Sequence, residues 1–201
     1  MNAFEKLYQE LRRKYGKPEG QWGMWCKRPK TRSEKEEVVV GAILTQRTNW
    51  KNVGLAMANL KKAKIKSIKD ICRSGASKLA LKIKPSGFYQ TKAGYLFGLA
   101  KFVIKRGGLD GLRGTDPDKL REELLELKGV GPETADSILL YALDKPVFVI
   151  DEYTRRLVKK RKLARNLSYS FLQKRFEENL RKDFRLFQDF HALVVIDGKN
   201  K

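Results

Sequence analysis

Hydrophobic residues recur along this chain with helical spacing, in blocks that glycine, proline and aspartate separate. The segment EEVVVGAILTQ, residues 36–46, is apolar on every side, as a buried helix is. Ser33, followed three residues later by Glu36, is typical of a capping box, so we expect this helix to start there. Asn49 and Asp116 are the expected N-caps of two later helices.

The same spacing predicts helices over most of the chain. Besides the segment above, they are expected at residues 1–16, 48–60, 67–75, 88–105, 115–127, 132–143, 152–163, 168–184 and 185–199. The apolar run VFVI, residues 147–150, is expected to be extended or a loop, because a single strand makes no sheet. The pattern as a whole therefore predicts an all-α fold.

The charge balance indicates a polyanionic partner. Lysine and arginine number 44 against 23 acids, so the net charge is +21, and the pI is near 10.0. DNA, RNA and an anionic membrane surface are the candidates. No apolar run approaches the roughly 20 residues of a membrane span, and residues 1–16 lack the pattern of a secretory signal. We expect a cytoplasmic protein, associated with the nucleoid in a prokaryote. A lysine-rich surface also suits a thermophile, which would account for part of the charge.

Few residues are available for a metal site. Cys26 and Cys72 are the only cysteines and cannot form a four-thiolate zinc or iron–sulfur site. We interpret them as thiols in or near the core. His191 is the only histidine, and its setting, FHALVV, predicts a structural role in a packed helix. We therefore expect no metal centre.

Two glycines, Gly129 and Gly131, form a tight turn between predicted helices in LELKGVGPETA. Glycine adopts positive φ without a Cβ clash and lets another backbone approach closely. Pro132 begins the next helix, whose first N–H groups and positive dipole end would face out of the turn. Such a helix end suits one DNA phosphate and reads no base sequence. The alternative is an ordinary turn between two antiparallel helices.

This segment resembles the helix-hairpin-helix of the DNA glycosylases related to endonuclease III, the HhH-GPD superfamily. The segment KPVFVIDEYTRR is similar to the family's short apolar link and its VDxxxxR motif. GAILTQRTNW is similar to the family's ILSQQT motif, and GFYQTKAGYL is similar to its GFYxxKAxxL motif. The segment FHALVV also fits the family. The resemblance spans about residues 40–156 and implies a two-lobed, all-α monomer that binds double-stranded DNA with a damaged base. One lobe would comprise residues 34–144, with the hairpin motif at about 117–143, and the other residues 1–33 and 145–201.

The resemblance assigns the chemistry to Asp151, which matches the family's catalytic aspartate and is also the expected N-cap of the following helix. A carboxylate beside C1′ stabilises the oxocarbenium-like transition state of base release. Family members that also cut the strand carry a lysine in GVGxKTA. Glu133 stands at that position, and a carboxylate cannot form an imine, so a monofunctional glycosylase is implied. Lys128, before the turn, is a weaker substitute for that lysine.

Two departures point to one branch of the family. The sequence has neither the hairpin lysine nor the four-cysteine iron–sulfur loop that follows the last helix in the endonuclease III branch. The chain therefore resembles the 3-methyladenine DNA glycosylases, which excise alkylated, often cationic, purines. The resemblance implies no cofactor apart from a monovalent cation on the hairpin carbonyls.

The remaining expected site residues contact DNA or the flipped base. Gln46 matches the residue that fills the hole left by that base, with a solvent-facing helix end as the alternative. The expected DNA contacts are Gln46, Gly129, Val130, Gly131, Glu133, Thr134, Arg155 and Lys159. A cationic purine gains from stacking and cation–π contact, so an aromatic pocket is expected, although core packing is the alternative for each ring. The expected pocket residues are Trp22, Trp25 and Trp50, followed by Phe88 and Tyr89.

The run RRLVKKRKLAR, residues 155–165, follows Asp151 and is interpreted as a phosphate-contacting surface, with a solvated helix face as the alternative. Three other functions remain open at this point. One is a glycosylase for uracil, hypoxanthine, a mismatch or an oxidised base, with or without lyase activity. Another is a DNA-binding helix-hairpin-helix module without catalysis. The third, a basic RNA-associated protein, explains the charge but not the order of the motifs.

Overall fold

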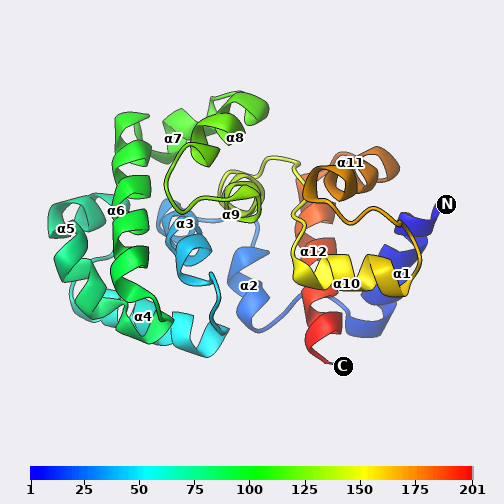
Figure 1. The fold of residues 1–201 in the computed structure, drawn as a ribbon, viewed down its shortest axis with the longest axis horizontal. Helices are drawn as coiled ribbons and strands as arrows, with labels where there is room; N and C mark the ends of the chain where they lie inside the picture. The colour runs from blue at the N-terminus through cyan, green and yellow to red at the C-terminus, as the bar shows by residue number, and fades with distance from the viewer. Residues whose placement is uncertain (201) are drawn as a thin grey trace. The chain divides into compact units, whose positions relative to one another are not determined.

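The computed structural model describes residues 1–200, and this part of the chain is helical without a β-strand, which confirms the all-α prediction (Figure 1). Residues 147–150 have no regular secondary structure. Among the described residues, no helix is both long and apolar enough for a membrane span. The elements in chain order are α1 (Ala3–Tyr15), α2 (Gln21–Trp25), α3 (Arg32–Leu44), α4 (Trp50–Lys62), α5 (Ile68–Lys82), the 3₁₀ turn η1 (Lys84–Ser86), α6 (Tyr89–Lys105), α7 (Gly108–Arg113), α8 (Pro117–Leu125), α9 (Pro132–Ser137), the π-helical turn η2 (Ile138–Ala142), α10 (Glu152–Lys160), α11 (Tyr169–Asn179) and α12 (Phe184–Lys199).

Two of the predicted N-caps are confirmed. The Asn49 side chain accepts a hydrogen bond from the Asn52 N–H at 2.9 Å and caps α4. The Asp116 carboxylate accepts from two N–H groups in the first turn of α8. Both bonds are local, which is why the sequence alone locates them.

The start of α3 differs from the prediction. Thr31, not Ser33, is the N-cap, and Glu34 completes the capping box by accepting from the Thr31 N–H at 2.7 Å. The predicted partner, Glu36, is buried and accepts from the Ile68 N–H at 3.0 Å instead. Glu36 therefore serves the first turn of another helix, α5, rather than its own.

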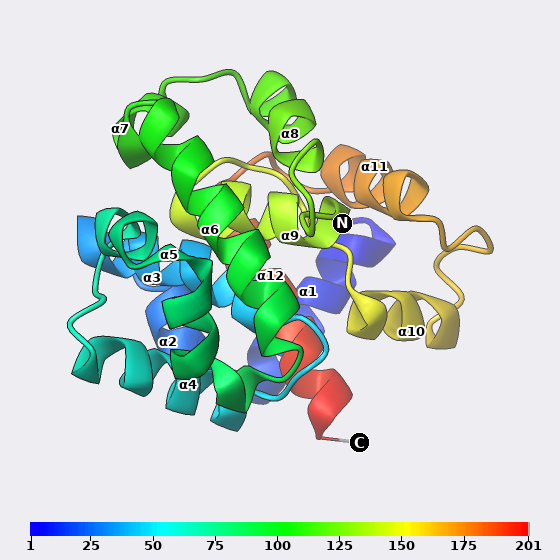
Figure 2. The ribbon, with the colours of Figure 1, turned by 60° about the vertical axis from the view of Figure 1, so that its left-hand side comes forward.

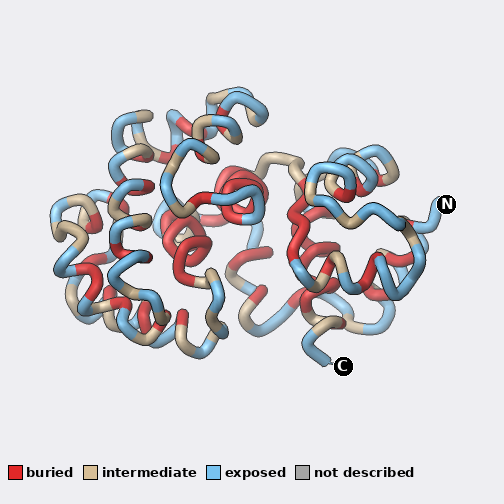
Figure 3. The backbone as a smooth tube through the Cα atoms, in the orientation of Figure 1, coloured by how far each residue is buried: buried red, intermediate tan, exposed pale blue. Residues whose placement is uncertain are grey.

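The chain divides into two compact units. We call Met1–Arg28 with Leu139–Lys201 the terminal unit, and Pro29–Ile138 the hairpin unit. The expected boundaries lay after residues 33 and 144. Figure 3 shows that each unit has buried segments of its own.

In the hairpin unit, α3 provides a continuous buried segment, residues 38–44. Helix α6 packs along α5 and against α3 (Figure 2). Gly75, with a φ of 70°, kinks α5 where the sequence predicted a helix end. Lys92 of α6 is buried, and its Nζ donates to the carbonyls of Leu44 and Ser86 at 2.9 and 2.7 Å. Burial lowers the pKa of Lys92 to about 8. Lys92 thus fixes the end of α3 and the η1 turn to α6.

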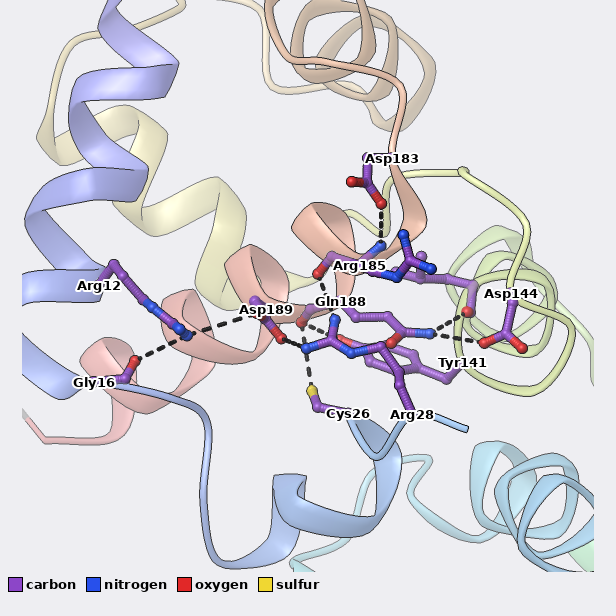
Figure 4. Close-up of polar contacts among 11 residues, drawn as sticks. Arg12, Gly16, Cys26, Arg28, Tyr141, Asp144, Asp183, Arg185, Gln188 and Asp189 are labelled. Atoms are coloured by element: carbon purple, nitrogen blue, oxygen red, sulfur yellow. Dashed lines mark hydrogen bonds and ion pairs between the residues drawn. The ribbon is translucent and has the colours of Figure 1, made fainter. Parts of the chain in front are cut away.

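In the terminal unit, α12 is the central helix and packs against α1 and α10. Polar contacts join the N-terminal segment to it, as Figure 4 shows. Arg28 donates to the carboxylate of Asp189 at 2.9 Å, and the Cys26 Sγ donates to the Gln188 carbonyl at 3.7 Å. These contacts explain how residues 1–28 form one unit with the C-terminal helices.

Candidate nucleic-acid interface and catalytic carboxylate

The glycine hairpin joins α8 to α9 in a conformation that requires glycine at one position. Gly129 has a φ of 86°, and a Cβ added there would lie 2.1 Å from the Tyr95 ring. Gly131 has a φ of −93°, and a Cβ added there would meet no atom within 4 Å. The first glycine therefore permits the turn, whereas the second is not needed for the fold of the free protein.

A buried ion pair fixes the two hairpin helices. Arg121 of α8 donates to both carboxylate oxygens of Asp136 in α9, at 2.7 and 3.1 Å. Asp136 is fully buried. This two-point geometry sets the orientation of α9. The N-terminus of α9 has Gly131 as its N-cap, with no side-chain capping bond, and Pro132 as its first residue. Its dipole end thus suits an anion.

Gln46 contacts the hairpin directly. Its Nε2 donates to the Gly129 carbonyl at 2.8 Å and to the Thr134 hydroxyl at 3.0 Å. Both amide hydrogens are therefore engaged, and Gln46 supports the hairpin in this structure. Gly131, Glu133 and Thr134 line the same cavity as Gln46.

The cavity beside Gln46 has a volume of about 580 Å³ and lies wholly in the hairpin unit. Arg47 and Phe88 line it, and both have positive φ, at 50° and 46°. Phe88 is 66% exposed, and Arg47 is exposed as well. A bulky aromatic residue in the left-handed region is strained, and strain of this kind concentrates at functional sites.

Asp151 caps α10 as predicted. Its Oδ1 accepts from the N–H of Thr154 at 2.7 Å and from the Thr154 hydroxyl at 2.8 Å. Its Oδ2 lies 3.5 Å from Nε2 of His191. The carboxyl group is buried, which raises its pKa, but the imidazole of His191 and the two donors of Thr154 outweigh burial. The net pKa of Asp151 lies below its ordinary value, so the group is a carboxylate at neutral pH.

His191 belongs to α12 and is buried beside Asp151. Its Nδ1 lies 2.8 Å from the hydroxyl oxygen of Tyr141, and that oxygen also lies 3.2 Å from the Gln188 carbonyl oxygen. Burial raises the pKa of Tyr141 well above its ordinary value, so Tyr141 is a neutral phenol. The sequence pattern predicted a structural role for His191 and did not indicate its contact with Asp151.

Two of the three tryptophans lie in this cluster. Trp22 and Trp25 are buried and meet edge to face, with ring centroids 5.9 Å apart. Trp22 also contacts His191, with a centroid distance of 5.6 Å, and Trp25 contacts Tyr141 at 5.2 Å. Trp50 belongs to the hairpin unit, where it is the first residue of α4. Trp22 is thus linked to Asp151 through His191, and Trp25 is linked to it through Tyr141 and His191.

The cationic run after Asp151 contains both engaged and exposed side chains. Arg155 donates to the Leu167 carbonyl at 3.3 Å, and Arg156 pairs with Glu152 at 3.1 Å. Lys159 and Lys160 are exposed. The exposed lysines are therefore better placed for phosphate contacts than Arg155, which holds the following loop.

Potential metal ligands are sparse. Within residues 1–200, no group of three His, Cys, Asp or Glu side chains is close enough to hold a metal ion. Two carbonyls in or beside the hairpin turn, those of Leu127 and Gly129, each accept one hydrogen bond. The monovalent cation expected on the hairpin carbonyls stays a prediction.

Comparisons with known proteins agree on one family. A family model described as "HhH-GPD superfamily base excision DNA repair protein" matches residues 40–182. A candidate DNA repair glycosylase of Methanocaldococcus jannaschii is 45% identical over 163 residues, which are 79% of this chain and 74% of that protein. The crystal structure of H. pylori 3-methyladenine DNA glycosylase bound to 1,N6-ethenoadenine is similar, with a TM-score of 0.81 and 30% identity, over 100% of this chain and 98% of that one. A trapped endonuclease III–DNA covalent intermediate has a TM-score of 0.76 and 19% identity over 100% and 88% of the two chains, which is a likeness of fold alone.

Proposed function

Since the chain belongs to the HhH-GPD superfamily of base excision DNA repair proteins, we propose that it is a DNA N-glycosylase acting on alkylated purines. It hydrolyses the bond between a flipped, damaged base and its sugar in double-stranded DNA, and leaves the strand uncut. The observation that carries this proposal is Asp151, a buried carboxylate at a helix N-terminus that remains ionised. Positive charge develops at C1′ in the transition state, and a fixed carboxylate stabilises it more than it stabilises the ground state.

Residues of both units bind the DNA backbone in this proposal. The N–H groups at the start of α9 take one phosphate, and the exposed lysines of α10 take others. Gln46 holds the hairpin, because both of its amide hydrogens are bonded there. We assign the filling of the vacated base position to its neighbour Arg47, and contact with the neighbouring bases to Phe88. Both side chains are exposed on the same cavity.

Phe88→Gly is expected to separate stability from activity. Glycine removes the strain of a positive φ, worth about 1 kcal/mol, and little packing is lost from a side chain that is 66% exposed. The melting temperature should therefore stay the same or rise. Single-turnover base release should fall about tenfold, because the flipped state loses the stacking contact of the ring. Lys105→Ala, at an exposed position at the end of α6, serves as the control and should change neither quantity. A Phe88→Gly variant with the original rate would contradict the assignment.

The alkylated purine is supported by the aromatic cluster around Asp151. Trp22, Trp25 and Tyr141 lie together, and a cationic purine gains from cation–π contact with such rings. The H. pylori neighbour that is 30% identical was crystallised with a modified adenine. Trp22 and Trp25 are buried in the free protein, so the short helix α2 has to shift to admit a base.

One observation favours a second candidate, a neutral lesion such as uracil or hypoxanthine. Lys199 lies near enough to Asp151 to feel its charge, and the net pKa of Lys199 is lowered because burial outweighs that attraction. An ammonium group beside the site repels a cationic purine, whereas it can donate to a base carbonyl. The lowered pKa of Lys199 weakens this repulsion, so the neutral lesion is only the second candidate.

A panel of duplexes tests the proposed substrate. DNA treated with a methylating agent is compared with duplexes that hold a single uracil, hypoxanthine or 8-oxoguanine, under single-turnover conditions. The proposal predicts fastest release from methylated DNA, as free methylpurine. Faster release of uracil or hypoxanthine would favour the neutral-lesion candidate and overturn the alkylpurine assignment.

The absence of strand cutting is a separate prediction. Glu133 occupies the hairpin position at which strand-cutting members of the family carry a lysine, and it is exposed on the cavity. Wild-type protein should therefore form no borohydride-trappable adduct with abasic DNA. Glu133→Lys should gain such an adduct, whereas Glu133→Gln should not. Trapping of the wild-type chain would contradict the proposal, and loss of that trapping in Lys128→Ala would identify the lysine responsible.

A further inference from the structure

The terminal unit contains a chain of polar contacts that ends at Asp151. It runs from the Gln188 carbonyl through the Tyr141 hydroxyl to Nδ1 of His191, and from Nε2 of His191 toward Oδ2 of Asp151. Figure 4 shows the first of these contacts. Tyr141 is fully buried, and His191 is 5% exposed. A buried polar chain of this kind is costly unless each member has a partner.

The hydrogen-bond pattern determines which nitrogen of His191 carries hydrogen. If the Tyr141 hydroxyl donates to Nδ1, a neutral imidazole carries its hydrogen on Nε2. If that hydroxyl donates to the Gln188 carbonyl instead, Nδ1 of His191 must donate to the Tyr141 oxygen. A neutral ring then has no hydrogen on Nε2, and the Nε2 lone pair faces the carboxylate of Asp151. That arrangement is repulsive and is therefore disfavoured. In every favourable case an Nε2–H faces Oδ2 of Asp151.

The two oxygens of Asp151 are held differently. Oδ1 accepts two hydrogen bonds from Thr154, whereas Oδ2 has His191 as its neighbour at 3.5 Å. That distance is within the reach of an ion pair and longer than a full N–H···O hydrogen bond. The buried Nε2 of His191 has no hydrogen-bond partner. Oδ2 therefore keeps lone pairs for a water or for the developing charge at C1′, while its orientation is constrained.

We propose that His191, directed by Tyr141, is the positioning residue that holds Oδ2 of Asp151 in its charged, reactive orientation. This inference rests on the proposed catalytic role of Asp151. Neither His191 nor Tyr141 contacts the substrate in this scheme. They act through the carboxylate, as the orienting member of a catalytic triad acts through its neighbour.

The pH dependence follows from the groups that face Asp151. On α12 these are His191 and Lys199, on the π-helical turn the group is Tyr141, and α10 contributes only the non-titrating Thr154. His191 lowers the pKa of the Asp151 carboxyl. Base release is therefore retained as pH falls and is lost only below the ordinary aspartate value. Removing His191 raises that pKa, so the acid limb of the rate profile should move to higher pH.

The test compares variants by single-turnover release of methylpurine from methylated DNA, measured across pH. His191→Leu should lower the rate constant at neutral pH about tenfold or more and raise the acid limb. His191→Gln, whose amide can donate toward Oδ2, should recover most of the rate. Val195→Ala is the structural control, because it opens a cavity in the same helix. It should lower the melting temperature and leave the rate and the acid limb unchanged.

The outcomes separate this inference from the proposed function. An inactive Asp151→Asn together with a His191→Leu that keeps the wild-type rate and acid limb would overturn the role of His191 alone. Release by Asp151→Asn at the wild-type rate would overturn the proposed function itself. Tyr141→Phe removes only the hydroxyl, so this variant tests the positioning role of His191 if His191→Leu does not fold. Its acid limb should move in the same direction, and an unmoved limb would overturn the inference.

Discussion

Asp151→Asn is expected to slow base release by about 10³-fold or more while DNA affinity changes less than about threefold. Asparagine is as good an N-cap as aspartate, and its side-chain oxygen can still accept from the Thr154 N–H, so the fold should be retained. In the proposed mechanism, the variant loses the negative charge beside C1′. The rate of free-base release is measured under single-turnover conditions, and affinity is measured on the same methylated duplex.

Glu152→Gln is the matched control for this variant. It removes a carboxylate from the adjacent position, but that side chain is exposed and pairs with Arg156. Its effect on base release should be less than about twofold, because a screened surface charge contributes little. Equal losses in the two variants would show that net charge near α10 matters rather than the placement of Asp151.

Gly129→Ala is expected to give the largest loss of stability. The new Cβ would lie 2.1 Å from the Tyr95 ring, and the backbone would have to keep a φ of 86°. Overpacking and the left-handed conformation together cost about 3 kcal/mol. For a chain of this size that lowers the melting temperature by roughly 6–12 °C. DNA affinity should fall as well, since α9 presents its N-terminus through this turn.

Gly131→Ala tests whether the loss of stability is specific to the position of Gly129. Its Cβ meets open space and its φ is ordinary, so its melting temperature should stay within about 1 °C of wild type. Tyr95→Ala should partly rescue Gly129→Ala, because it removes the ring with which the new methyl group collides. Independent, additive losses in the double variant would show that the clash with Tyr95 is not the cause.

The sequence alone was sufficient to predict a helix N-cap where the capping hydrogen bond joins residues that are close together in the chain. Asp116 and Asp151 cap their helices because a carboxylate reaches N–H groups two or three residues ahead. The sequence predicted a capping box from Ser33 to Glu36 for α3, whereas the structure has one from Thr31 to Glu34. Glu36 is instead buried against α5, a contact between residues far apart in sequence.

The candidate site depended more on distant contacts, and the sequence predicted it less completely. The spacing of FHALVV marks His191 as buried, but no pattern indicates that Asp151, forty residues earlier, lies against it. The motif predicts that Gln46 fills the position of the flipped base, and the hydrogen bonds from Gln46 to the hairpin cannot be read from the sequence. Positive φ at Arg47 and Phe88 could not be predicted either, since neither residue type favours it.

The central claim is that this chain releases a base from DNA by hydrolysis rather than only binding DNA. The most direct measurement is a chromatographic time course of free base from methylated DNA incubated with the unsubstituted protein, with strand integrity followed in the same samples before any alkali. We predict that free methylpurine accumulates to the amount of protein or beyond, while the strand stays intact until alkali is added. Tight binding of the same DNA without any released base would contradict the claim and would make the chain a helix-hairpin-helix binding module.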